Sequence, residues 1–168
     1  MVSLEIIGLI FTGLSISISI IYYANVLRNA NITRQAQLFM NIYSQINSNE
    51  ANGNEFEIMK IELKTAEDYL ELLNDKTKYV ALNWFMSYYE GMGVLVRQGL
   101  VGIDLVAQMQ SGGIIWFWER YRDAFLDCRV KMKWDRFMIE LEYLYDRVKE
   151  YMVEHHPDVG IESPNPTG

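Results

Sequence analysis

Residues 6–27 are mostly apolar and contain no charged side chain, and no other segment of the chain has a comparable run. This run exceeds the ~20 residues that an α-helix needs to cross the hydrocarbon core of a bilayer. Tyr22 and Tyr23 lie near its end, where aromatic rings are typical of a membrane interface. Because the chain starts with an acidic segment and lacks a small-residue cleavage site, we predict a retained transmembrane anchor in residues 1–30. A cleaved signal peptide and a buried helix of a soluble domain are the alternatives.

The charges beside this segment favour one orientation in the membrane. Arg28 and Arg34 follow it, whereas Glu5 and the α-amino group precede it. Arginine and lysine are retained on the cytoplasmic side of a membrane. We therefore predict a single-pass protein of the cell membrane, with its N-terminus outside and its C-terminal domain in the cytoplasm.

Small residues recur on one face of the predicted span. Gly8, Thr12, Ser15 and Ser19 are spaced by four, three and four residues, which places them on the same side of a helix. Such a face lets a second helix approach closely, and it predicts a homo-oligomer or a membrane-protein partner, in addition to contact with membrane lipid. In the alternative interpretation, the hydroxyl groups hydrogen-bond only to their own helix.

After residue 30, apolar positions recur at helical spacing almost everywhere. The pattern predicts an all-α protein, in which the transmembrane helix is followed by a small helical bundle over residues 31–156. Three prolines and two glycines from Pro157 onward predict a disordered tail, residues 157–168. The helices of the bundle are expected, in chain order, at residues 38–46, 56–63, 65–73, 75–98, 104–109, 114–128 and 137–155.

Polar residues and glycines mark the expected helix ends. Thr65, with Asp68 three residues later, resembles a capping box. Asn74 or Asp75 is expected to begin the longest helix of the bundle, and Gly99 to end it. Interruptions of the helical pattern, all rich in Asn, Ser or Gly, are expected at residues 29–31, 47–54 and 111–113.

The composition excludes some classes of function. The chain has 168 residues and a formal net charge of −7, whereas a general nucleic-acid-binding protein needs a basic face, so no nucleic-acid partner is expected. Cys128 is the single cysteine, which rules out an internal disulfide and is typical of a reducing compartment. Its helical spacing with Tyr121 and Phe125 predicts a small buried side chain rather than a reactive thiol.

The residues that usually carry catalysis are few. His155 and His156 are the only histidines, and adjacent histidines on a helix point in different directions, so they cannot share one metal ion. The sequence contains no zinc or di-iron motif, phosphate loop or dinucleotide fingerprint. We therefore expect no metal and no cofactor, and we assign no catalytic residue.

Glu90 is the most informative ionisable residue, because it lies in the most apolar helix of the predicted bundle. A buried carboxylate must be paired or must shift its pKa, and Arg120 or Arg122 is the expected partner. We favour an ion pair that fixes the helix register, with a ligand-binding or catalytic role as the alternative. Gly91 and Gly93 are expected to permit close helix packing at the same point.

Several short motifs resemble a known family. The chain resembles a family of small bacterial and archaeal membrane-anchored proteins that is known as a domain of unknown function, and the likeness covers roughly residues 4–150. The resemblance implies a single-pass helical protein, and it supplies no catalytic residues to transfer. The motifs that carry it are residues 34–38, residues 89–96, Gly99 with Leu100, the helix around Trp118, and residues 142–144.

These observations predict a membrane-anchored helical interaction or scaffold protein without enzymatic activity, as an accessory subunit of a membrane complex or a sensor. Trp116 lies off the apolar stripe of its helix, which suggests contact with a membrane or a partner. One alternative is a membrane-surface enzyme that uses Glu90 with Arg120 or Arg122. A second is a small oligomeric channel or transporter component, which would require residues 79–96 to form a second span.

Overall fold

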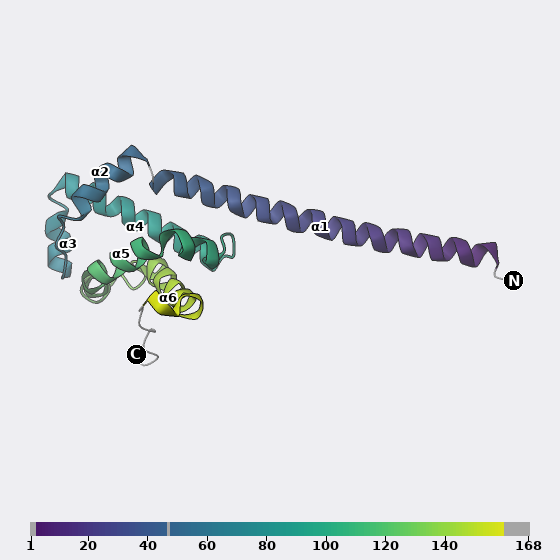
Figure 1. Ribbon diagram of the computed structural model, residues 1–168. Coiled ribbons are helices and arrows are strands. Elements are labelled where there is room, and N and C mark those ends of the chain that lie inside the picture. Colours follow the sequence, from purple (N-terminus) through teal and green to yellow (C-terminus); the bar gives the residue numbers. More distant parts are fainter. Residues whose placement is uncertain (1–2, 47, 160–168) are drawn as a thin grey trace. The chain divides into compact units, whose positions relative to one another are not determined.

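The structure is a computed structural model that describes residues 3–46 and 48–159, and all regular elements in these ranges are helical (Figure 1). The prediction of an all-α fold with a long apolar N-terminal helix is therefore confirmed. Contacts divide the chain into two units, Met1–Phe39 and Met40–Gly168. The helices are α1 (Leu4–Ile46), α2 (Asn49–Ile58), α3 (Ala66–Leu72), α4 (Lys76–Arg97), α5 (Ile103–Met132) and α6 (Ile139–His155), followed by the short 3₁₀ turn η1 (Pro157–Val159).

Helix α1 runs without a break through residues 29–31, so the interruption expected there is wrong. Its large apolar side chains are exposed, for example Leu9 and Phe11. Among the described residues, this is the one helix that is long and apolar enough to cross a membrane, by length and composition, over Ile6–Ser44. None of its most apolar stretch is buried. The second span considered at residues 79–96 does not meet the same criterion.

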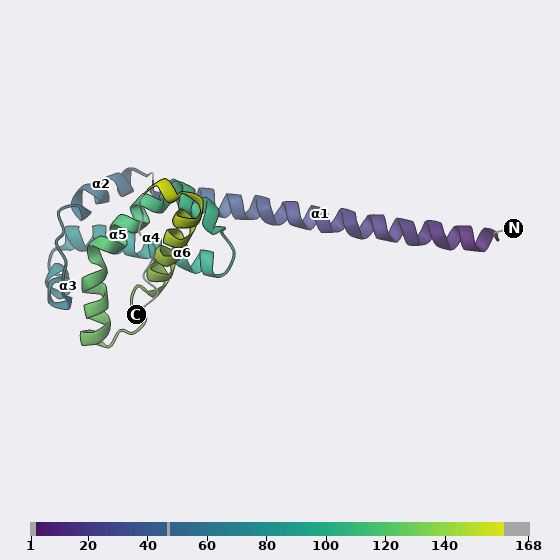
Figure 2. The ribbon, with the colours of Figure 1, turned by 60° about the horizontal axis from the view of Figure 1, so that its bottom comes forward.

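Helix α6 packs against both α4 and α5, while α2 lies against α4 and α3 against α5 (Figure 2). Aromatic rings fill the space between α4 and α5. The Phe117 ring of α5 lies 5.2 Å from that of Tyr89 and 6.1 Å from that of Phe85, measured between centroids. Phe117 and Tyr121 are fully buried, so the hydrophobic core is continuous along the middle of α5.

Two glycines allow helices or side chains to approach closely. A Cβ atom on Gly93 of α4 would overlap with the backbone carbonyl of Glu140 in α6, and a Cβ on Gly113 of α5 would lie 2.6 Å from the hydroxyl of Tyr89. Gly91, by contrast, faces open space. The expected role in close packing is therefore confirmed for Gly93 and wrong for Gly91.

The structure confirms the caps that the sequence predicts. Thr65 and Asp68 form a reciprocal capping box at the start of α3, and the Asp75 carboxylate accepts a hydrogen bond from the Lys78 amide at the start of α4. Gly99 follows α4 with a φ of 67°, a backbone conformation that glycine adopts without strain. Cys128 is buried as expected, and burial raises the pKa of its thiol to about 11.

Two of the expected interruptions are corrected. Residues 49–54, expected to be a loop, belong to α2, which ends at Ile58 rather than near residue 63; Asn47 lies outside the described residues. Residues 111–113 lie inside α5, which is continuous, so the short helix expected at residues 104–109 is part of a longer one. Gly112 and Gly113 therefore do not end a helix. Gly113 instead leaves room for the Tyr89 hydroxyl, which packs against it. The predicted tail lies outside the described residues from residue 160 onward.

Replacing Thr65 by alanine is expected to lower the free energy of unfolding by about 1 kcal/mol, because the Asp68 amide loses its hydrogen-bond acceptor at the first turn of α3. Urea denaturation of the detergent-solubilised chain, followed by tryptophan fluorescence, measures this change. Thr77→Ala is the matched control, because Thr77 is an exposed residue inside α4 and alanine is the better helix former. An equal loss of stability in both variants would contradict the capping role.

Candidate functional site

Glu90 points to the first turn of α6 rather than to an arginine. Its Oε2 atom accepts a hydrogen bond from the backbone amide of Leu141 at 2.8 Å. The residue before α6, Met138, has a φ of 55° and no side chain that caps the helix. Glu90 therefore caps α6 from α4, and a carboxylate at this position also interacts favourably with the positive end of the helix dipole.

The surroundings of Glu90 raise the pKa of its carboxyl group. Burial raises the pKa of the Glu90 carboxyl above its usual value, and the neighbouring Glu140 carboxylate adds to this effect. The backbone amides of Leu141 and Glu140 and the charge of Arg129 lower the pKa, but they do not outweigh burial. A raised carboxyl pKa is found at catalytic sites, but it also follows from a half-buried structural cap.

Arg120 and Tyr121 bind backbone carbonyl groups at the C-terminal end of another helix, α2, and just after it. Arg120 Nη2 donates hydrogen bonds to the carbonyl oxygens of Met59 at 3.1 Å and Ile61 at 3.0 Å, just after α2. The Tyr121 hydroxyl donates to the carbonyl of Ile58, the last residue of α2, at 2.7 Å. Together these side chains bind carbonyl groups at and just after the end of α2, of which that of Ile58 also accepts a hydrogen bond from the Ile61 amide.

The ion pair predicted between Glu90 and Arg120 or Arg122 is corrected by this geometry. Arg120 bonds to the chain after α2, and Arg122 lies beside Asp123 with 3.5 Å between Nε and Oδ1. Glu90 and Arg120 bind mainly to backbone groups, which the sequence pattern does not identify as their partners. The structure does not bring the three together into one site.

The hydroxyl groups of the small-residue face on α1 bond to their own helix. Thr12 donates to the Gly8 carbonyl at 2.9 Å, Ser15 to the Phe11 carbonyl at 2.9 Å, and Ser19 to the Ser15 carbonyl at 2.8 Å. These bonds satisfy the hydroxyl groups within an apolar helix. They leave the small residues free to contact a second helix, so the predicted packing role of Gly8, Thr12, Ser15 and Ser19 stays a prediction.

Replacing Tyr121 by phenylalanine is expected to lower the free energy of unfolding by about 1 kcal/mol, because the buried carbonyl of Ile58 then keeps only the Ile61 amide as donor and Arg120 Nε loses its acceptor. Tyr151→Phe is the matched control, since its hydroxyl makes an exposed 3.3 Å hydrogen bond with Gln108, and we expect a loss below ~0.5 kcal/mol. Urea denaturation of both variants tests the difference. Equal midpoints would show that the Tyr121 hydroxyl does not hold the end of α2.

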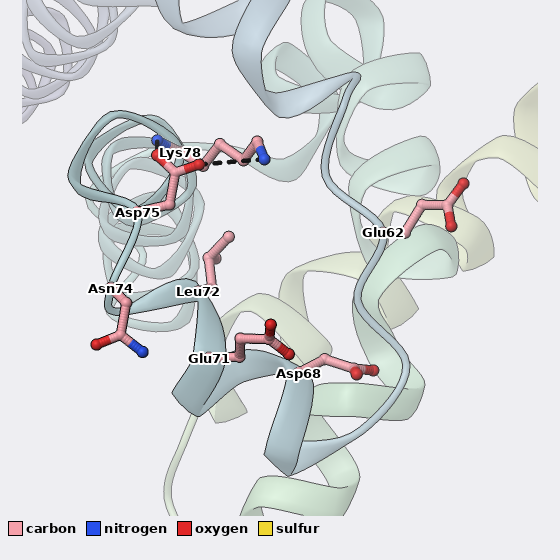
Figure 3. A pocket seen from close by; sticks show the side chains of 7 residues that line it. All are labelled: Glu62, Asp68, Glu71, Leu72, Asn74, Asp75 and Lys78. Carbon is pink, nitrogen blue, oxygen red and sulfur yellow. Dashed lines mark hydrogen bonds and ion pairs between the residues drawn. The ribbon is translucent and has the colours of Figure 1, made fainter.

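An electronegative hollow of about 440 Å³ lies beside α3 and the start of α4 (Figure 3). Asp68 and Asp75 are both engaged there in capping their helices, and their hydrogen bonds with backbone amides lower the pKa values of these carboxyls. The Glu62 side chain extends away from Glu71 and Asp68 (Figure 3). Among the described residues no group of three or more His, Cys, Asp or Glu side chains is placed to hold a metal ion. The lining residues are Glu62, Asp68, Glu71, Leu72, Asn74, Asp75 and Lys78.

A second, smaller pocket of about 270 Å³ lies among α2, α4 and α5, and we call it the aromatic pocket. Helix α2 contributes Glu55, Ile58 and Met59 to its lining, and α4 contributes Phe85 and Tyr89. Helix α5 supplies Gly112, Gly113, Trp116 and Phe117. Two features of the sequence point to this pocket: Trp116 lies off the apolar stripe of its helix, and two glycines, Gly112 and Gly113, follow one another. In the sequence alone, the two glycines are more typical of a helix end.

Comparison with known proteins gives a family but no activity. No curated protein and no solved structure matches this chain. The family described as "Domain of unknown function (DUF4760)" matches residues 4–148, which is most of the chain. The chain belongs to this family, as the resemblance of its motifs predicted.

Proposed function

We propose that this protein is a membrane-tethered helical interaction protein, which acts as an accessory subunit of a membrane complex or as a sensor. The observation that carries the proposal is helix α1, whose most apolar stretch is entirely exposed along a length sufficient to cross a bilayer. An exposed apolar surface of this size is costly in water, and a lipid environment removes the cost.

The engagement of the charged residues supports binding over catalysis. Glu90 caps α6, Arg120 and Tyr121 hold the end of α2, and Asp127 accepts a hydrogen bond from the Ala66 amide at the start of α3 at 2.8 Å. Each of these groups fixes one helix relative to another. These contacts tie together the helices of the second unit, Met40–Gly168, which we call the helical unit, and such an arrangement suits a surface that a partner recognises.

Fractionation of cells that express the chain with a C-terminal tag tests the tether. We expect the full-length protein in the membrane fraction, resistant to extraction by alkaline carbonate. Ile16→Arg combined with Ile20→Arg is expected to release it, because each arginine at the centre of a span costs ~2.5 kcal/mol or more. Val130→Arg is the control, since Val130 is 79% exposed in the helical unit. Intact parent protein in the soluble fraction, or a cleaved N-terminus, would overturn the proposal.

We further propose that the N-terminus lies outside the cell and the helical unit in the cytoplasm, on the basis of Arg28 and Arg34. Protease added to right-side-out vesicles should leave the tagged unit intact until detergent is added. Digestion of the helical unit without detergent would reverse the orientation.

Self-association through the small-residue face is also a proposal, and the chain offers a matched pair of serines to test it. Ser15 lies on this face, whereas Ser17 lies about 200° around the helix, and both hydroxyls bond back to their own helix at 2.9 Å. Ser15→Ile is expected to reduce cross-linking between copies, or recovery of a membrane partner, several-fold. Ser17→Ile should leave both unchanged, and equal behaviour of the two variants would remove this interface.

A further inference from the structure

We propose that the aromatic pocket binds a small organic cation, namely a protonated amine with an apolar or aromatic body. The inference does not depend on the membrane anchor, because the pocket is formed by α2, α4 and α5 alone. It follows from the shape of the pocket, from the hydrogen-bonding character of its polar groups and from a glycine that the packing of the fold does not require.

Aromatic side chains form much of the pocket wall. Phe85, Tyr89 and Phe117 are a contacting cluster with centroid separations of 5.2–6.2 Å, and each of them is largely buried. Trp116 is 41% exposed and stands at the edge. Ring faces carry negative electrostatic potential, and a set of rings around one cavity is the usual environment for an organic ammonium group.

Three side chains bring polar groups to the pocket: the Glu55 carboxylate accepts, the Tyr89 hydroxyl accepts or donates, and the Trp116 indole N–H donates. Glu55 is exposed at the pocket, and its carboxylate has no ion-pair partner among the described residues. A carboxylate accepts but does not donate, and a tyrosine hydroxyl can accept as well as donate. A ligand that binds the Glu55 carboxylate must bring a hydrogen-bond donor, and an ammonium group supplies N–H donors and also neutralises the charge of Glu55.

Arg120 lies beside this wall, with its guanidinium carbon 5.5 Å from the centroid of the Trp116 ring. Two of its three nitrogen atoms already have partners, because Nη2 donates to two carbonyl oxygens and Nε donates to the Tyr121 hydroxyl at 3.2 Å. Glu55 is the charged residue that lines the pocket itself. The preference for a cation therefore depends on Glu55.

Gly112 is an exposed residue of α5 that lines the pocket. A glycine inside a helix costs about 1 kcal/mol relative to alanine, and α5 contains two in succession. Gly113 is explained by the close approach of the Tyr89 hydroxyl, but a Cβ on Gly112 would meet no atom within 4 Å. Because Gly112 lines the pocket, a side chain at this position would occupy ligand space rather than clash with the fold.

Isothermal titration of the detergent-solubilised full chain tests the inference with three probes of the same shape: 2-phenylethylammonium, neutral 2-phenylethanol and anionic phenylacetate. We expect saturable binding of the ammonium probe, at least fivefold weaker binding of the alcohol, and no binding of the anion. Glu55→Gln should weaken the ammonium probe at least fivefold and leave the alcohol unchanged. Glu62→Gln, a charge removal at an exposed residue outside this pocket, should change neither.

Gly112→Leu should abolish the binding of the ammonium probe and of the alcohol probe, because leucine fills the cavity. Gly91→Leu is its matched control, since Gly91 is also an exposed helical glycine that faces open space but lies outside the pocket. Unchanged tryptophan fluorescence and urea midpoint would show that the Gly112 variant is folded. Absence of saturable binding, equal affinity for ammonium and alcohol, or insensitivity to Glu55→Gln would each overturn the proposal.

Discussion

Replacing Gly93 by alanine is expected to lower the free energy of unfolding of the helical unit by about 3 kcal/mol, at the upper end of the usual cost of overpacking. The added Cβ would overlap with the carbonyl oxygen of Glu140, which is a backbone atom of α6 and cannot rotate away as a side chain would. Helix α6 must then move away from α4, which it contacts along much of its length. Urea denaturation monitored by tryptophan fluorescence measures the loss.

Gly91→Ala provides the control for this effect, because it makes the same substitution two residues away in the same helix. Gly91 is exposed and faces open space, so alanine should raise the free energy of unfolding by about 0.5–1 kcal/mol through its higher helix propensity. The two variants are thus expected to shift in opposite directions. A stabilised Gly93→Ala protein would show that α4 and α6 do not pack through this glycine.

The helix caps that the sequence predicts correctly depend on residues close together in the chain. Thr65 and Asp68 are three residues apart, Asp75 caps the helix that begins at the next residue, and Gly99 follows the helix that it ends. Each signal is complete within one helical turn, so no knowledge of the tertiary structure is needed. The long apolar segment of α1 is predictable for the same reason.

Two of the incorrect predictions, at Gly113 and Glu90, concern residues whose role depends on a distant part of the chain. Gly113 was expected to end a helix, but the side chain of Tyr89 occupies the space where its Cβ would be, and the helix continues. Glu90 was expected to need an arginine, but its partner is a backbone amide 51 residues later. Backbone groups at helix ends are not visible as partners until the helices are placed.

The aromatic pocket was missed for a related reason. Its residues come from three helices, and each residue alone is consistent with an ordinary hydrophobic core. Trp116 was expected to contact a membrane or a partner because it lies off the apolar stripe, and the structure places it at the pocket edge, 41% exposed. An exposed aromatic side chain indicates a surface, but it does not identify what the surface binds.

Replacing Glu90 by alanine is expected to lower the free energy of unfolding by about 1–3 kcal/mol, because the partly buried Leu141 amide loses its acceptor and Met138 cannot replace it. Glu90→Gln retains an acceptor and should lose less. Glu154→Ala is the control, since that side chain is 78% exposed near the end of α6. Equal effects of Glu90→Ala and Glu154→Ala would show that Glu90 does not cap α6.

The effect of Glu90 on stability should also depend on pH, with a sign set by its raised pKa. Between the ordinary pKa of 4.5 and the raised value, the folded protein binds more protons at this carboxyl than the unfolded chain does. The stabilisation linked to this proton is fully present below pH 4.5 and is lost as the pH rises through the raised pKa. The stability of Glu90→Gln relative to the parent should therefore increase with pH across this window.

Urea denaturation of the parent and Glu90→Gln between pH 4.5 and 7.5 measures this difference. Comparing the two proteins at each pH removes the contributions of other carboxyls, including Asp146, whose pKa is raised by burial and by the nearby Glu142 and Glu150. A relative stability that falls with increasing pH would mean that the ionised carboxylate, held by the amides of α6, is the favoured form. Burial would then not be the dominant influence on Glu90.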